Sequence, residues 1–192
     1  MERELLLTGV GGQGVQLASQ VLARAALAEC REVMVLGTYG GTMRGGSTDS
    51  CVVAADEPIR TPPIVSRAWA AIAMHDRFFA PTAAKLHSES VAFVNASLFD
   101  SGVEFDGVRV FEVEATRIAA ELGSPMSASL VLAAAFSGAT GFASCESLVA
   151  AMRECVPSYR KQHIEANERA LRGGFGLLES AQVEAWPAGV AA

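Results

Sequence analysis

The stretch Gly9-Val10-Gly11-Gly12-Gln13-Gly14 follows a short apolar run, Leu5–Thr8, and precedes a long helical pattern from Val15 to Ala28. The apolar run is continuous rather than alternating, which is typical of a strand buried on both faces. A strand, a glycine turn and a helix in this order form a cradle for an anion. Glycines let the backbone approach a ligand closely, and the free N–H groups at the helix start attract negative charge. These residues therefore predict an α/β fold that begins with this turn.

The same turn fits the dinucleotide pattern Gly-x-Gly-x-x-Gly, which normally has an acidic residue about 20 positions further on to hold the ribose. Here the second predicted strand, Val33–Leu36, is followed by the glycine-rich loop Gly37–Gly46, which contains no acid. The glycine part of the dinucleotide pattern is present, and the acidic residue that would confirm it is missing. A stand-alone NAD or FAD enzyme is therefore disfavoured, and a tight turn kept for packing alone remains an alternative.

Composition narrows the function classes further. The chain has 192 residues, enough for one domain with a sizeable core, and 51% of them are hydrophobic while 19% are charged. Such an apolar sequence suggests that part of the surface is buried against partners. The net charge of −6 gives no basic face for nucleic acid. The N-terminus, Met1–Glu4, is not typical of a secretory signal, so we expect a cytoplasmic protein.

The cysteines and histidines do not indicate a metal centre. Their spacings match neither zinc nor iron–sulfur motifs, and no histidine pair has ligand spacing. We expect buried free thiols in a reducing compartment. The residues are Cys30, Cys51, Cys145, Cys155, His75, His87 and His163.

The segment from Gly123 to Cys145 has no charged residue and is long enough to cross a bilayer. It is, however, rich in serine, glycine and alanine and poor in large apolar residues, unlike a stable membrane span. We expect instead a small-residue helix that is buried on most sides.

Predicted strands and helices alternate along the first two thirds of the chain, and helical patterns follow. This order predicts a three-layer, Rossmann-like α/β domain with a mostly parallel sheet and a helical C-terminal part. We assign residues 1–176 to this domain and 177–192 to an irregular tail, with Gly173-Gly174 ending regular structure. The predicted strands cover 4–8, 32–36, 47–55, 68–74, 90–95 and 108–113, and the predicted helices 15–28, 75–87, 114–122, 126–141, 144–155 and 158–172.

Both glycine-rich loops follow strands, so they are expected at the same edge of the sheet, where α/β proteins bind ligands. This places Tyr39 and Arg44 near the turn Gly9–Gly14. An arginine there could hold a phosphate or carboxylate, or pair with an acid of this chain or a neighbouring subunit. No nucleophile elbow, Walker A lysine or paired carboxylates can be identified. The residues alone therefore describe a non-catalytic subunit.

Several motifs together resemble the gamma subunit of 2-oxoacid:ferredoxin oxidoreductases, the family of pyruvate, 2-oxoglutarate and indolepyruvate oxidoreductases. The similarity covers roughly residues 4–175. The glycine turn alone is a weak signal, but its combination with Tyr-Gly and Arg-Gly-Gly-Ser at this spacing is specific. The motifs are Gly9–Gly14, Ala23–Ala26, Tyr39-Gly40, Arg44-Gly45-Gly46-Ser47, Glu57–Ile59, Val94–Ser97 and Asn167–Gly173.

The resemblance implies a complex that decarboxylates a 2-oxoacid on thiamine diphosphate with Mg, transfers the acyl group to coenzyme A (CoA), and passes electrons through [4Fe-4S] clusters to ferredoxin or another acceptor. In such complexes the alpha and beta subunits, with or without a delta subunit, hold these cofactors. The gamma subunit lies near the CoA side, so CoA is a candidate ligand. By resemblance, the residues of interest are Gly9, Gly11, Gly12, Gln13, Gly14, Tyr39, Arg44, Gly45 and Gly46, with no catalytic or metal-binding role assigned.

The sequence departs from the family's common pattern at three places. Thr42-Met43 stands where an acid often precedes the arginine, Ser66-Arg67 replaces Pro-Asp, and Ser127–Ser129 lacks a common asparagine. These departures leave the 2-oxoacid open among 2-oxoglutarate, pyruvate, branched-chain, indolepyruvate and arylglyoxylate enzymes. A stand-alone dinucleotide- or CoA-binding α/β module is the alternative function.

Overall fold

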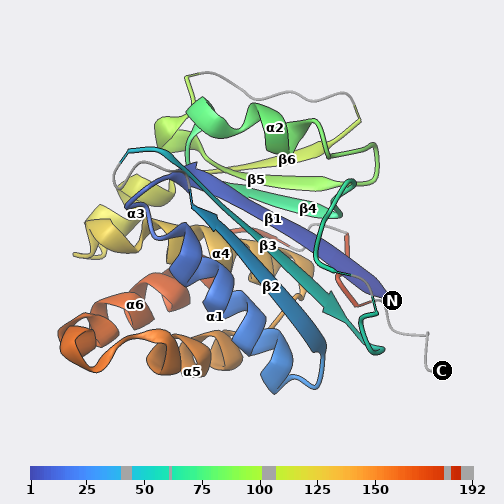
Figure 1. The fold of residues 1–192 in the computed structure, drawn as a ribbon. Coiled ribbons are helices and arrows are strands. Elements are labelled where there is room, and N and C mark those ends of the chain that lie inside the picture. Colours follow the sequence, from blue (N-terminus) through green and yellow to red (C-terminus); the bar gives the residue numbers. More distant parts are fainter. Residues whose placement is uncertain (40–44, 61, 101–106, 180–182, 187–192) are drawn as a thin grey trace.

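The computed structural model describes residues 1–39, 45–60, 62–100, 107–179 and 183–186. These residues form a six-stranded sheet in the order β2-β3-β1-β4-β5-β6 (Figure 1). β3 runs antiparallel to both of its neighbours, and the remaining strands share one direction, so the predicted mostly parallel α/β sheet is confirmed. The strands are β1 (Glu2–Val10), β2 (Glu32–Tyr39), β3 (Ser47–Ala55), β4 (Ala70–Ala73), β5 (Val91–Asn95) and β6 (Arg109–Val113).

Strand β3 separates the first two strands of the chain. The sequence does not predict the position of β3 between β1 and β2, because alternating and continuous apolar patterns look the same in either strand direction. The turn after β1 and the loop after β2 nevertheless lie at the same edge, as expected, because β1 and β2 point the same way. The backbone N–H of Gly11 donates a hydrogen bond to the carbonyl oxygen of Gly46 at 2.8 Å.

Helices cover both faces of the sheet. On one face α1 and α4 contact the strands, while α5 packs against α1 and α6 against α4 (Figure 1). On the other face the short η1 (Asp76–Phe78) and α2 cover β4 and β5 through Phe79 and Ala83. The predicted layers and helical C-terminal part are thus confirmed. The α-helices are α1 (Val15–Ala28), α2 (Ala80–Ala83), α3 (Ala115–Glu121), α4 (Ala128–Thr140), α5 (Cys145–Cys155) and α6 (Ile164–Phe175).

The charge-free segment forms α4, which is buried along nearly its whole length, as its composition predicts. Its small residues allow neighbouring helices to approach closely. Among the described residues, no helix combines the length and apolar character that a membrane crossing requires.

The prediction that Gly173-Gly174 end regular structure is wrong, because α6 continues to Phe175. A Cβ on Gly174 would lie 2.4 Å from the carbonyl oxygen of Val131, and one on Gly138 would lie 1.9 Å from that of Phe175. The absence of side chains at Gly138 and Gly174 lets α4 and α6 pack backbone against backbone. Here glycine serves helix packing rather than helix termination.

The predicted helix over 75–87 is also wrong in extent. The chain forms η1 and then only four residues of α-helix, with Pro81 in its first turn. Proline lacks the N–H that a longer continuous helix would need at this position.

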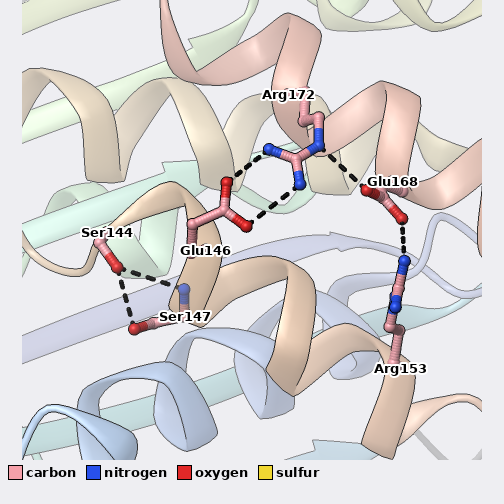
Figure 2. Close-up of polar contacts among 6 residues, drawn as sticks. All are labelled: Ser144, Glu146, Ser147, Arg153, Glu168 and Arg172. Atoms are coloured by element: carbon pink, nitrogen blue, oxygen red, sulfur yellow. Dashed lines mark hydrogen bonds and ion pairs between the residues drawn. The ribbon is translucent and has the colours of Figure 1, made fainter.

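Charged side chains join α5 to α6 on the surface (Figure 2). The guanidinium of Arg172 donates to both carboxylate oxygens of Glu146, at 2.7 and 3.1 Å, and to Glu168 at 3.0 Å. Glu168 also accepts from Arg153 at 2.6 Å. These hydrogen bonds lower the pKa of both Glu146 and Glu168.

Part of the C-terminal segment packs against the rest of the domain. The indole N–H of Trp186 donates to the carbonyl oxygen of Phe142 at 2.9 Å, and the guanidinium of Arg31 lies 4.0 Å from the centre of its ring. Arg3, near the start of β1, donates to the carbonyl oxygen of Ala185 at 2.7 Å. The domain boundary at residue 176 remains a prediction.

Candidate functional site

The glycine turn is closed by Gln13. Its backbone N–H donates to the carbonyl oxygen of Val10 at 3.0 Å, and its side-chain oxygen accepts from the Val10 N–H at 2.7 Å. Gly12 and Gly14 have φ values of 105° and 81°, a region that favours glycine. Gly9 is buried, and a Cβ there would lie 2.8 Å from the Gln13 side-chain oxygen. Gln13 and Gly9 therefore support the shape of the turn.

The loop after β2 returns to this turn. A Cβ on Gly11 would lie 3.4 Å from the backbone nitrogen of Gly45 and 3.5 Å from the Gly46 oxygen. Tyr39 ends β2 opposite Thr48 of β3. The structure therefore brings Gly11, Gly45 and Gly46 together, whereas Arg44 lies outside the described residues and its reach toward the turn remains a prediction.

Helix α1 starts directly after Gly14, which as a glycine provides no side-chain cap. No acidic residue lies in its first turn. The first N–H groups of a helix lack intrahelical partners and carry partial positive charge, which favours an anion. Ser129 of α4 approaches this end so closely that a Cβ on Gly14 would lie 2.5 Å from its hydroxyl.

A cleft of about 620 Å³ opens beside this helix end. Gly12 and Gly14 form part of its lining, and η4 (Ser158–His163) contributes Arg160 and His163. Two exposed side chains also line it, Met126 with 79% and Tyr159 with 73% of its surface accessible. The cleft is lined by Gly12, Gly14, Gln16, Leu17, Gln20, Ser124, Met126, Ser127, Val156, Pro157, Tyr159, Arg160, Gln162, His163 and Asn167.

A buried row of polar side chains fixes the inner wall of the cleft. The hydroxyl oxygens of Ser124 and Ser127 lie 2.5 Å apart, and Ser127 donates to the amide oxygen of Asn167 at 2.7 Å. These bonds tie α6 to the turn that precedes α4. On the opposite side, the Gln16 amide donates to the carbonyl oxygen of Asp49 at 2.8 Å and ties α1 to β3.

Among the described residues that were predicted for the site, Gly12 and Gly14 line the cleft, while Arg44 lies outside the described part of the chain. The site assignment remains a prediction. The cleft lining also contains residues that the sequence did not predict for the site, among them Gln16, Arg160 and His163. Arg160 and His163 follow the glycine turn by more than 140 residues, and no spacing in the sequence links them to it. Only the packing of α6 on α4 brings η4 to this edge.

The cysteines do not form a site among the described residues, where no group of three or more potential ligands could hold a metal ion. Cys145 and Cys155 occupy opposite ends of α5, roughly 15 Å apart at 1.5 Å per residue. The prediction of buried thiols is correct only for Cys51, since Cys30 is exposed and the other two are half-buried. Cys30 follows α1 in a positive-φ turn, with φ of 62°, which places it at the surface.

Known proteins share the fold and the family of this chain. The sequence profile of the family described as pyruvate ferredoxin/flavodoxin oxidoreductase matches residues 4–177. The chain belongs to this family. The resemblance inferred from the glycine turn and the Arg-Gly-Gly-Ser motif is therefore confirmed.

Relatives within the family match the chain over nearly its full length. The 2-oxoglutarate synthase subunit KorC of Methanocaldococcus jannaschii is 32% identical over 93% of this chain and 95% of its own. The pyruvate synthase subunit PorC of Methanothermobacter thermautotrophicus is 28% identical over 94% of this chain and 98% of its own. These relatives are themselves named as subunits of larger enzymes.

Solved structures show the same fold. The gamma subunit of a keto/oxoacid ferredoxin oxidoreductase from Geobacter sulfurreducens superposes with a TM-score of 0.78 at 25% identity, over 91% of this chain and 95% of its own. A 2-oxoglutarate:ferredoxin oxidoreductase from Magnetococcus marinus, with 2-oxoglutarate, coenzyme A and succinyl-CoA bound, gives 0.81 at 17% identity. That match covers 95% of this chain but 32% of the other, so this fold also occurs within a longer chain.

Proposed function

We propose that this chain is the non-catalytic gamma subunit of a multi-subunit 2-oxoacid:ferredoxin oxidoreductase. The complex converts a 2-oxoacid and CoA to acyl-CoA and CO2 and passes the electrons to ferredoxin or another acceptor. The observation that carries this proposal is the family match over residues 4–177. The relatives' names include both 2-oxoglutarate and pyruvate synthases, so the 2-oxoacid has to be found by assay.

Thiamine diphosphate, Mg and the [4Fe-4S] clusters belong, in this proposal, to partner subunits of the alpha, beta or delta type. The described cysteines support this division, because their positions do not fit cluster ligation. We also propose a cytoplasmic complex, where unpaired thiols persist in reduced form.

The cleft beside the glycine turn is proposed to hold an anionic part of CoA. The uncapped start of α1, Arg160 and His163 offer donors suited to phosphate groups. From the family resemblance, Arg44, which lies outside the described residues, is proposed as a candidate contact for an anionic group or a neighbouring subunit. Among the described residues, those proposed to contact CoA are Gly12, Gly14, Arg160 and His163.

The first experiment is purification of the tagged full chain from its own cells, followed by identification of the recovered subunits. We expect a thiamine-binding subunit and a cluster-carrying subunit, and CoA-dependent reduction of an acceptor with one 2-oxoacid. A chain recovered alone, with tight binding of a nucleotide, would instead favour the stand-alone binding module.

The CoA site is tested in the purified complex by comparing two neighbouring positions. Arg160→Ala should raise the apparent KM for CoA about tenfold, as expected for one lost charge-assisted contact of roughly 1.5 kcal/mol. Lys161→Ala, next to it but outside the cleft, should leave this KM unchanged. Equal effects of Arg160→Ala and Lys161→Ala on this KM would refute the cleft as the CoA site. In a separate variant, Arg44→Ala should lower either the affinity for CoA or the yield of the complex.

A further inference from the structure

The face of the sheet opposite α1 and α4 is only partly covered by helix. η1 and α2 pack over β4 and β5. On the same face, Leu6 of β1, Cys51 of β3 and Leu36 of β2 form one row across three strands. In the part of the chain that the structure describes, no helix covers the β3–β2 end of this row. This face of the sheet forms the floor of a groove of about 480 Å³.

Two apolar side chains line this groove without being buried. Leu36 has 45% of its surface accessible and Ile64, from the segment that follows β3, has 80%. Val65, next to Ile64, packs into a small core with Leu6 and Cys51, which anchors this segment on the sheet. The groove is therefore a formed surface with exposed apolar walls, a feature that marks binding sites for other proteins.

The helical side of the groove carries positive charge. Arg77 and Lys85 both line it. Within the described ranges, neither of these side chains forms an ion pair. The one carboxylate in the lining, Asp49, accepts hydrogen bonds of 2.6 Å from the hydroxyls of Thr8 and Ser47, one on each oxygen. Among the described residues the two cations thus have no carboxylate partner, and the described lining holds two cations against one carboxylate although the whole chain has a net charge of −6.

We propose that this groove, lined by Leu36, Ile64, Arg77 and Lys85, binds a segment of another subunit of the oxidoreductase complex. That segment places apolar side chains between Leu36 and Ile64 and an aspartate or glutamate at the two cations. This inference rests on the proposed function, because it requires a partner subunit.

A second copy of this chain fits the groove less well. A two-fold contact centred on it would bring Arg77 and Lys85 of both copies, four cations in all, into one interface. Like charges at such a contact repel, and the described lining of each copy brings only one carboxylate, Asp49, against two cations. Charge complementarity therefore favours an acidic segment of a different chain.

The test uses the tagged full chain produced together with the subunits of its complex. The double change Arg77→Glu/Lys85→Glu should lower recovery of the partner subunits at least tenfold at physiological salt, and Ile64→Ser should lower it several-fold. Two matched controls lie elsewhere on the surface: Lys161→Glu reverses an exposed charge, and Leu27→Ser removes an apolar side chain that is 60% exposed. Both controls should stay within twofold of the unchanged chain.

A photo-reactive side chain in place of Ile64 gives an independent measurement on the assembled complex. It should cross-link to a partner peptide that contains an aspartate or glutamate. Unchanged partner recovery, or a cross-link only to a second copy of this chain, would overturn the groove proposal. In either case the unchanged chain would still recover its partners, so the proposed function would stand, whereas no recovery at all would refute both.

Discussion

Two neighbouring glycines in α6 should respond in opposite ways to the same substitution. A Cβ at Gly174 would lie 2.4 Å from the carbonyl oxygen of Val131 and 3.0 Å from the Cβ of Ala134, whereas ordinary contacts begin at 3.4 Å. Both obstacles belong to the buried helix α4, so the two helices must separate by about 1 Å to relieve the contact. At Gly173 the nearest atom, 2.8 Å away, is the terminal methyl carbon Cδ1 of the Leu122 side chain, which can rotate.

The expected free energies follow from two opposing effects. Alanine stabilises a helix interior by about 1 kcal/mol relative to glycine. Overpacking against rigid backbone costs roughly 3 kcal/mol, the upper end of the usual range. Gly174→Ala should therefore destabilise the chain by about 2 kcal/mol, and Gly173→Ala should stabilise it by up to about 1 kcal/mol.

Urea unfolding and thermal melting of the two purified variants measure this difference. For a chain of this size, 1 kcal/mol corresponds to roughly 2–4 °C, so a difference of about 3 kcal/mol should separate the two melting temperatures by about 6–12 °C. Equal midpoints for Gly173→Ala and Gly174→Ala would show that α4 and α6 are not held at the close approach described above.

Three further predictions concern charge, thiol chemistry and the C-terminal segment. Hydrogen bonding to Arg172 lowers the pKa of Glu146. The ion pair between these residues therefore stabilises the folded chain fully above the ordinary carboxyl pKa, and this stabilisation is lost as pH falls through the lowered pKa. The difference in urea midpoint between the unchanged chain and Arg172→Gln should therefore be measurable at pH 7 and disappear in acid; a difference that persists at pH 3 would contradict this. Burial raises the pKa of Cys51 to about 11, so this thiol should resist maleimide at pH 8 while exposed Cys30 reacts, as peptide mapping would report. Trp186→Ala removes a hydrogen bond and the packing of a half-buried ring, and should cost about 2 kcal/mol in thermal unfolding, whereas no change would mean that this segment is not bound in solution.

Much of the fold could be predicted from short-range patterns. The limits of α1 and β3 follow from the glycine turn, the apolar spacing and the turn residues around them. The burial of α4 follows from its lack of charge. Each of these features depends on residues that are neighbours in the sequence, which is the range over which periodicity is informative.

The features that could not be predicted depend on residues far apart in the chain. Nothing within β3 fixes its antiparallel position between β1 and β2. Gly174 lies in the last turn of α6, where the close approach of α4 leaves no room for a side chain, and this contact cannot be read from the residues around it. Arg160 lies by the glycine turn for a similar reason, because the position of η4 follows from the packing of α6.

The attachment of Trp186 and Ala185 beside the start of β1 has a consequence for gene architecture. Arg3 and Ala185 are joined by a hydrogen bond, so the two ends of the folded unit meet at the edge of the sheet opposite the glycine turn. A unit whose ends meet can be inserted into a longer polypeptide with short connections and without disturbing the edge that carries the glycine turn. The match to 32% of the longer Magnetococcus marinus chain shows the same fold in such a setting. This fold thus occurs both as a separate chain and as part of a longer one.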